Sequence, residues 1–199
     1  FCSIITYMNI FNNKNKKERV AVYIDGSNFY GYLKDKEINF PKGVKFNFKK
    51  FVEFLIGGKQ ECISKRYYTG VFRNLDGGEK SANLVMGQQK FFSNLEKDGF
   101  TIKRGRIVPI GNTYKDKGTD VKIAVDLIVG AVDDMYDTAI LISSDTDLIP
   151  AVSYIKYKNK KVEYIGFSHA PSLGMQKHAN ISRLLLPEDI EKFKENVLL

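Results

Sequence analysis

The chain has 199 residues, 43% of them hydrophobic and 27% charged, and its formal net charge is +8. These proportions indicate one globular domain with a sizeable core, and no apolar run is long enough to span a membrane, so we expect no membrane contact. Two cysteines, Cys2 and Cys62, exclude a disulfide framework and favour a reducing, cytoplasmic location. The positive balance favours a polyanionic partner, nucleic acid above all.

We expect residues 1–18 to be a flexible N-terminal extension and residues 19–199 to form one domain. R-V-A-V-Y-I-D-G-S-N (19–28) is a β-branched run followed by an aspartate and turn residues, which predicts a central parallel strand buried on both faces. Phenylalanines recur at helical spacing before paired glycines and predict a helix. The elements expected in this half are that helix at 47–58, a strand at 63–72, a helix at 79–99 and an edge-type strand at 100–108.

The second half of the chain continues the alternation. After a loop, we expect a helix from Asp120 to about Met135, a strand at 139–142, a helix at 148–157, a strand at 162–167, a short strand or helix lead-in at 183–186 and a helix at 187–194. Strands that alternate with helices imply right-handed crossovers and one parallel sheet. The predicted fold class is therefore α/β, a single parallel-sheet α/β/α sandwich of Rossmannoid type.

Aspartates follow two of the predicted strands. Asp25 ends the first strand, and A-I-L-I-S-S-D-T-D (139–147) ends a buried strand at two serines followed by Asp145 and Asp147. Each aspartate alone is explained by a turn or a helix cap, which Ser and Asp form readily. However, the carboxyl ends of parallel strands meet at one edge of a sheet, where ligand sites form.

A third aspartate lies in the first turn of the helix that begins near K-G-T-D-V-K-I-A-V-D (117–126). Counting at helical period from Asp120 places Ala124, Leu127 and Ala131 on its face, which predicts that Asp120 points toward the sheet. A cap is again the simpler alternative. By the same count Asp126 falls on the polar face, and we expect it to be solvated and paired with Lys122.

Four aspartates thus converge on one edge, and they would repel each other unless a cation lay between them. Two carboxylates about 4 Å apart repel by roughly 4 kcal/mol at an effective dielectric near 20. Oxygen ligands alone are typical of Mg²⁺ or Mn²⁺. The two histidines, His169 and His178, have no zinc-ligand spacing and are expected to be solvated loop residues. The predicted metal ligands are Asp25, Asp120, Asp145 and Asp147.

The three motifs V-Y-I-D-G-S-N (22–28), K-G-T-D-V-K-I-A-V-D (117–126) and A-I-L-I-S-S-D-T-D-L-I-P (139–150) together resemble the NYN domain. This is the LabA-like branch of the PIN ribonuclease superfamily, and the resemblance covers roughly residues 19 to 186. It implies a PIN-like fold and a Mg²⁺- or Mn²⁺-dependent nuclease that usually acts on RNA. Ser144 and Thr146 replace a glycine and a serine common in the family, and Asn180 stands where many members carry an acid.

The resemblance also implies roles for these residues. Asp25, Asp120, Asp145 and Asp147 match the acidic metal cluster, and Asn28 matches a polar residue that holds a water or orients Asp25. Asp126 matches a common family acid, although the helical count leaves it structural. The implied products carry 5′-phosphate and 3′-hydroxyl ends. Divalent metals provide the nucleophilic water and relieve negative charge on the phosphate.

Single-stranded RNA is the expected partner, and a homodimer is compatible with the sequence. Cations must surround an acidic cleft if RNA is to approach it, and Tyr114 could stack on an unpaired base. The run Lys156, Lys158, Lys160 and Lys161 is better explained as a solvated helix end, and an ordinary basic loop explains the other cations equally well. The residues expected to contact nucleic acid are Arg104, Arg106, Tyr114, Lys115, Lys117, Ser27 and Ser144.

Other functions remain open on the residues alone. The main alternative is an RNA-binding or regulatory module that keeps the fold with little turnover. A nucleotide binder is disfavoured because no G-x-G-x-x-G or G-x-x-x-x-G-K-[ST] follows a strand. A phosphatase with an aspartyl nucleophile is disfavoured because D-G-S-N lacks the second acid two residues on.

Overall fold

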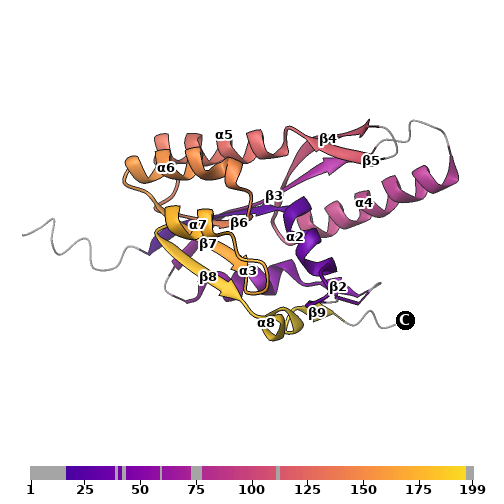
Figure 1. Ribbon diagram of the computed structural model, residues 1–199, viewed down its shortest axis with the longest axis horizontal. Coiled ribbons are helices and arrows are strands. Elements are labelled where there is room, and N and C mark those ends of the chain that lie inside the picture. Colours follow the sequence, from indigo (N-terminus) through magenta and orange to yellow (C-terminus); the bar gives the residue numbers. More distant parts are fainter. Residues whose placement is uncertain are drawn as a thin grey trace, which may run out of the picture.

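Figure 1 shows a central sheet with helices on both of its faces. The computed structural model describes residues 17–38, 40–41, 44–58, 60–72, 78–110 and 113–195, without the side chains of 109, 110, 113 and 114. Its first elements are β1 (Glu18–Asp25), α2 (Gly26–Lys34), β2 (Lys45–Phe46), α3 (Phe48–Ile56), β3 (Gln60–Val71), α4 (Glu79–Lys97), β4 (Thr101–Ile110) and β5 (Thr113–Lys117). They are followed by α5 (Thr119–Val132), β6 (Thr138–Ile142), the 3₁₀ helix η1 (Thr146–Leu148), α6 (Ile149–Tyr157), β7 (Lys161–Phe167), α7 (Leu173–His178), β8 (Ile181–Leu185), α8 (Pro187–Glu191) and β9 (Lys194–Glu195).

The main sheet has the strand order β5-β4-β3-β1-β6-β7-β8, and every neighbouring pair is parallel except β4 and β5. The predicted α/β class, with helices on both sides of a parallel sheet, is confirmed. Two local predictions were wrong. Residues 113–117 form an antiparallel edge strand where a loop was expected, and the chain enters β1 at Glu18, inside the expected extension. The remainder of that extension, residues 1–16, lies outside the described residues.

The central strand β1 separates two cores because its side chains alternate between the faces of the sheet. Val20, Val22 and Ile24 pack among α2, α3 and α4, while Ala21 and Tyr23 pack among α5, α6 and α7. Every residue of β1 from Val20 to Asp25 is buried, as expected for a central strand covered on both sides. The aspartate that ends the strand is therefore delivered to a fixed position.

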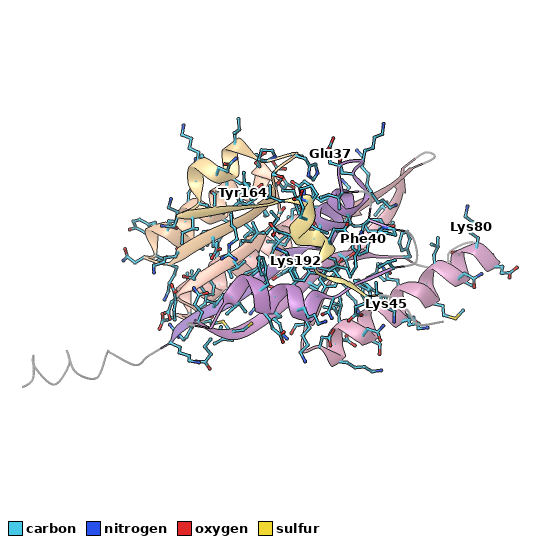
Figure 2. The ribbon with its side chains drawn as sticks, turned by 90° about the horizontal axis from the view of Figure 1, so that it is seen from below. Glu37, Phe40, Lys45, Lys80, Tyr164 and Lys192 are labelled. Carbon is cyan, nitrogen blue, oxygen red and sulfur yellow. The ribbon has the colours of Figure 1, made fainter. Side chains whose placement is uncertain are left out.

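A small ribbon of β2 and β9 closes the α2–α4 side of the molecule. The backbone N–H of Asn47 donates to the carbonyl of Phe193 (2.8 Å), and the Phe46 ring packs on the Phe193 ring with 5.7 Å between centroids. In Figure 2, Phe40 and Lys192 lie beside α8 on this side, whereas Lys80 lies far out along α4. The ribbon thus anchors the C-terminal segment against the aromatic core.

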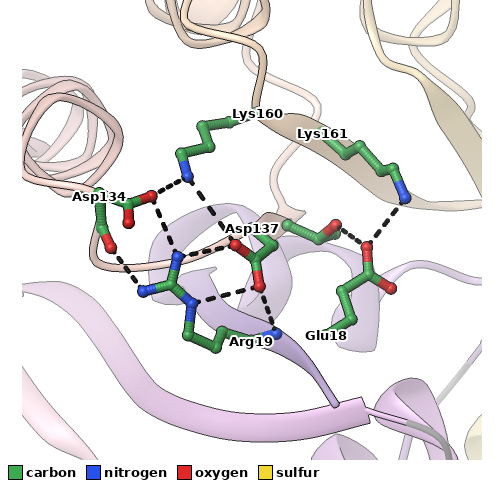
Figure 3. Close-up of polar contacts among 7 residues, drawn as sticks. Glu18, Arg19, Asp134, Asp137, Lys160 and Lys161 are labelled. Atoms are coloured by element: carbon green, nitrogen blue, oxygen red, sulfur yellow. Dashed lines mark hydrogen bonds and ion pairs between the residues drawn. The ribbon is translucent and has the colours of Figure 1, made fainter. Parts of the chain in front are cut away.

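A charged network joins the strands at their amino ends (Figure 3). The guanidinium of Arg19 donates to both carboxylate oxygens of Asp137 (2.7 and 3.2 Å) and to Asp134 (3.0 Å), and Lys160 also bonds Asp134. Arg19 lowers the pKa of Asp137 to about 2, mainly by hydrogen bonding to it. The network lies at the opposite end of β1 from Asp25, so it stabilises the fold and takes no part in the site described next.

Candidate active site

The chain reverses direction across the sheet between β1 and β6. From β1 it continues through α2 and α3 to β3 on one side, while β6 pairs with the other edge of β1 and leads through α6 to β7. Because α2 and α6 pack on opposite faces, the carboxyl ends of β1 and β6 lie at a switch point, the position where open parallel sheets usually have their ligand crevice. The register Ile24↔Ile142 places Asp25 beside Ser143 at this switch point.

Asp25 is only 3% exposed and serves as the N-cap of α2. Its Oδ1 accepts the backbone N–H of Asn28 (3.1 Å), and its Oδ2 accepts the hydroxyl of Ser143 (2.8 Å). Burial raises the pKa of Asp25 to about 6, against the lowering effect of these two hydrogen bonds. The negative charges of Asp120 and Asp145 at the same edge of the sheet raise it further.

The segment after β6 is ordered by its own hydroxyl and carboxylate groups. Ser143 Oγ accepts the backbone N–H of Asp145 (3.2 Å), and Asp145 Oδ1 accepts that of Asp147 (2.9 Å) as the N-cap of η1. Asp145 is therefore a helix cap, as the simpler alternative predicted, and its backbone N–H is linked to Asp25 through the Ser143 hydroxyl. Asp147 is exposed at the start of the same turn.

Asp120 approaches the same carboxylates from the first turn of α5. Partial burial raises its pKa, and the charges of Asp145, Asp116 and Asp147 raise it further. Asp120 itself is exposed, so the expectation that it turns away from water was wrong, while its interactions with the carboxylates at the strand ends agree with the expected direction toward the sheet. The buried stripe of α5 runs instead along Thr119, Ile123, Leu127, Gly130 and Ala131.

Asn28 connects the two strand-end motifs. Its side-chain carbonyl accepts the backbone N–H of Ser144 (3.1 Å), so the turn after β1 and the turn after β6 are tied together. The Ser144 hydroxyl bonds the hydroxyls of Tyr32 and Tyr164, the latter at 2.7 Å. Ser144 was predicted to contact nucleic acid, but its hydroxyl is held by two tyrosine hydroxyls. This favours a role in positioning the loop that carries Asp145.

Asp116, which the sequence reasoning missed, is a fifth carboxylate at this edge. Its Oδ2 accepts the hydroxyl of Ser27 (3.1 Å), its Oδ1 accepts that of Thr119 (2.7 Å), and its charge contributes to the raised pKa of Asp120. A Cβ on Gly105 would lie 2.7 Å from Asp116 Oδ1, so the glycine leaves room for this side chain. Its place four residues before Asp120 was the available signal.

Asp126 contradicts the sequence prediction. Its Oδ2 accepts the hydroxyl of Tyr68 (2.8 Å) and pairs with Lys103 (3.1 Å) and Arg66 (3.4 Å), while Lys122 donates to a backbone carbonyl in β4. The helical count began at Asp120, whereas the buried stripe of α5 begins at Thr119, and this difference of one position wrongly placed Asp126 on the outward face. It is a structural residue, as expected, but a partly buried one that joins α5 to the sheet.

Five of the seven predicted nucleic-acid contacts fall on the β4–β5 hairpin, whereas Ser27 and Ser144 follow β1 and β6. Arg106 pairs with Lys117 and Val108 with Lys115, so alternation places Arg104, Arg106, Lys115 and Lys117 on one face of the hairpin. All four are exposed, and Arg104 stacks over the Phe92 ring at 5.5 Å. Gly105 and Asp116 belong to the opposite face, so these cations flank the carboxylate edge instead of pointing into it. The side chain of Tyr114 lies outside the described residues.

The carboxylate oxygens at the carboxyl ends of β1 and β6 are suitable ligands for a divalent cation, although they do not converge on a common ion position. Within the described parts of the chain, no three His, Cys, Asp or Glu side chains are arranged to hold a metal ion. The carboxylates nevertheless raise one another's pKa, which is the electrostatic condition that a cation relieves. Asn180 accepts the backbone N–H of Val162 (2.9 Å) at the amino end of β7, so it adds nothing to this edge.

Comparison with known proteins gives a family and a fold. The family model described as "NYN domain" matches residues 19–182. The crystal structure of a protein of unknown function from Vibrio parahaemolyticus is similar to this chain with a TM-score of 0.64 and 23% sequence identity, over 87% of this chain and 96% of that one. No curated protein matches the chain significantly. In the part of the chain that the structure describes, no helix is long and apolar enough to cross a membrane.

Proposed function

Because the chain belongs to the NYN domain family of PIN-like nucleases, we propose that it is a divalent-metal-dependent ribonuclease that hydrolyses single-stranded RNA. The observation that carries this proposal is the convergence of carboxylates from three separate motifs at the crevice between β1 and β6. Burial and mutual repulsion raise the pKa of Asp25 to about 6 and also raise that of Asp120. Strongly perturbed carboxylates in a crevice are typical of functional sites.

Asp25, Asp120, Asp145 and Asp147 are the residues that would hold Mg²⁺ or Mn²⁺. When bound, such an ion neutralises charge on the phosphate and makes a water more acidic. The chain itself contributes rigidity at Asp25, because Asn28 and Ser143 hold both carboxylate oxygens. Asp25 would thus be a fixed ligand, and the exposed side chains of Asp120 and Asp147 could rotate to complete the coordination of the ion.

The acid–base groups of the proposed reaction are also aspartates. The expectation that both histidines are solvated loop residues was wrong, because His178 lies in α7 with its ring bonded to the carbonyl of Gly174, and the His169 side chain is 9% exposed, 3.9 Å from Asp35. Among the described residues, neither ring bonds any of the four aspartates. Asp120 and Asp147 are the exposed members of the set and are free to accept the proton of the attacking water. We expect products with 5′-phosphate and 3′-hydroxyl ends.

Charge distribution favours a polyanionic substrate despite the acidic crevice. The net charge of the chain is +8, and Arg104, Arg106, Lys115 and Lys117 are exposed on the hairpin that precedes Asp120. Cations at this position attract the phosphates on either side of the scissile bond and leave the crevice to the carboxylates. A single strand is favoured because it can bend from the hairpin into the crevice.

One observation favours the alternative function, an RNA-binding module with little turnover. The carboxylates of the described residues are not arranged around a common metal position, so binding without hydrolysis would need no further change. The two functions differ in whether bound RNA is cleaved, and only cleavage requires the aspartates. Loss of a carboxylate should stop cleavage by a nuclease and should leave RNA bound by either.

The test is a cleavage assay on end-labelled RNA and single-stranded DNA of the same sequence, with and without Mn²⁺. Asp25→Asn should lose orders of magnitude in rate while binding RNA normally, as should Asp120→Asn and Asp145→Asn. Asp133→Asn is the matched control because this aspartate is exposed at the far end of α5. RNA that is bound and left intact by wild type in Mn²⁺ would reject the nuclease and support the binding module.

A further inference from the structure

The outward side of α5 is apolar. Val121, Val125, Val129 and Val132 are 66%, 51%, 45% and 53% exposed, and they lie on the side of the helix opposite its buried stripe. Within α5 and its caps, only Lys122 and the C-cap residue Asp133 bring charge to that side. A helix that is apolar all round is normally buried, and valine is a poor helix former, so four exposed valines do not stabilise this helix by themselves.

The spacing of the outward residues is that of a helix-pairing seam. Val121, Val125, Ile128, Val132 and Met135 are separated by four, three, four and three residues, which is the a/d pattern of a coiled coil. Ile128 is half-buried and Met135 lies just beyond the helix end, 43% exposed. The pattern is complementary to itself when two copies pack about a two-fold axis near its centre at Ile128.

The charges beside the seam select one orientation. Lys122 lies beside the amino end of the seam, where its exposed ammonium bonds the Arg104 carbonyl in β4, and Asp133 lies beside its carboxyl end. Lys122 and Asp133 lie on the same flank of the helix, and same-flank residues face each other only in an antiparallel pair. When that pair is centred on Ile128, Lys122 of one copy is level with Asp133 of the other, whereas a parallel pair places neither charge opposite its counterpart. Nucleic acid is a poor occupant for this surface, because a phosphate backbone would meet one lysine and a row of valines.

We propose that the chain forms a two-fold homodimer in which α5 packs antiparallel against α5 of a second copy. Figure 1 shows α5 and α6 side by side along one outer side of the molecule. A stable interface needs about 800 Å² per partner, more than one pair of short helices provides. The neighbouring helix α6 adds Tyr154 and Tyr157, which are 40% and 77% exposed, as further apolar area.

The dimer has a consequence for the carboxylate edge, although it does not depend on the proposed function. Asp120 lies at the amino end of each α5, eight residues from the centre of the pair at Ile128. At 1.5 Å per residue, the two Asp120 positions would be about 24 Å apart along the helix pair. The two crevices therefore lie at opposite ends of the interface and remain open.

The first test measures mass by sedimentation equilibrium for wild type, Val125→Glu and Met86→Glu. Met86 is the matched control, a 62% exposed apolar residue on α4. Wild type should dimerise in the micromolar range, Val125→Glu should weaken association at least about 10-fold, and Met86→Glu should not. A monomeric wild type, or equal behaviour of the two variants, would overturn the proposal. Unchanged circular dichroism shows that Val125→Glu is folded.

The second test asks for the orientation by reversing the two charges. Lys122→Glu and Asp133→Lys should each weaken the dimer, since each opposes two like charges across the interface. The double variant should restore association to near the wild-type level, because the pair is re-formed with opposite sign. Failure of the double variant to exceed either single variant would exclude the antiparallel pairing.

Discussion

Replacing the buried carboxylate at the end of β1 with a neutral amide should stabilise the metal-free protein. Burial raises the pKa of Asp25 from 3.8 to about 6, a difference of about two pKa units. At about 1.4 kcal/mol per unit, ionising Asp25 costs the folded state about 3 kcal/mol at neutral pH. Asp25→Asn removes that cost, but it weakens one of the bonds to Asn28 or Ser143, worth about 1 kcal/mol.

The net gain of about 2 kcal/mol should raise the melting temperature by roughly 4–8 °C for a domain of this size. The sign also fixes the pH dependence. Because the folded-state pKa of Asp25 is raised, its stabilising contribution is complete below about pH 4 and is lost as the pH rises through about 6. The advantage of Asp25→Asn should therefore be absent near pH 4 and fully developed above pH 7.

Thermal unfolding in a chelator, followed by circular dichroism at several pH values, makes this measurement. Glu61→Gln is the control, since this exposed carboxylate at the amino end of β3 should change the melting temperature little at any pH. A lower melting temperature for Asp25→Asn at pH 7 would refute the reasoning. So would a gain that is equally large at pH 4 and pH 7, because it could not come from the ionisation of Asp25.

Three further predictions concern parts of the molecule away from Asp25. Asp126→Ala should lower the free energy of unfolding in urea by about 2–3 kcal/mol, because Arg66 and Tyr68 lose a partly buried partner. Mn²⁺-dependent cleavage should stay within a few-fold of wild type, and an unchanged urea midpoint would contradict these interactions. Asp137→Asn should lower the free energy of unfolding by about 1 kcal/mol at pH 7, after allowance for solvent screening. Because the folded-state pKa of Asp137 is lowered to about 2, this loss should disappear as the pH falls from about 4 to 2, and a loss that persists at pH 2 would exclude the ion pair as its source. Neutralising Arg104, Arg106 and Lys115 together should weaken the binding of single-stranded RNA. The slope of log binding constant against log salt concentration should become shallower by about 0.7 for each phosphate that is no longer bound, and an unchanged slope would mean that RNA binds elsewhere on the surface.

The sheet and its aspartates were predictable because the rules that place them are local. A β-branched run that stops at Asp25, and a second that stops before Asp145, indicate buried parallel strands whose carboxyl ends meet at one edge. Neither inference needs knowledge of a distant partner. The same run cannot specify strand order, and it did not reveal that α2 begins at Gly26, directly after Asp25.

The failures depend on interactions between residues that are distant in the sequence. Asp126 is held by Arg66 and Lys103, and no helical count from Asp120 contains that information. The hairpin strand β5 is rich in lysine, so its own residues favour a solvated loop, and only pairing with β4 makes it a strand. Asp116 was missed for the same reason, since its role is evident only when Ser27 and Thr119 are seen beside it.

Direct measurement of Mn²⁺ binding tests the central claim, that aspartates from three motifs form one metal centre. The electron paramagnetic resonance signal of free Mn²⁺ falls when the ion is bound, so a titration reports binding without any requirement for activity. Wild type and Asp133→Asn should both remove Mn²⁺ from solution, and Asp145→Asn should bind it at least about 10-fold more weakly, as loss of a charged ligand requires. Binding that is absent in wild type, or equally strong in Asp145→Asn, would contradict the claim.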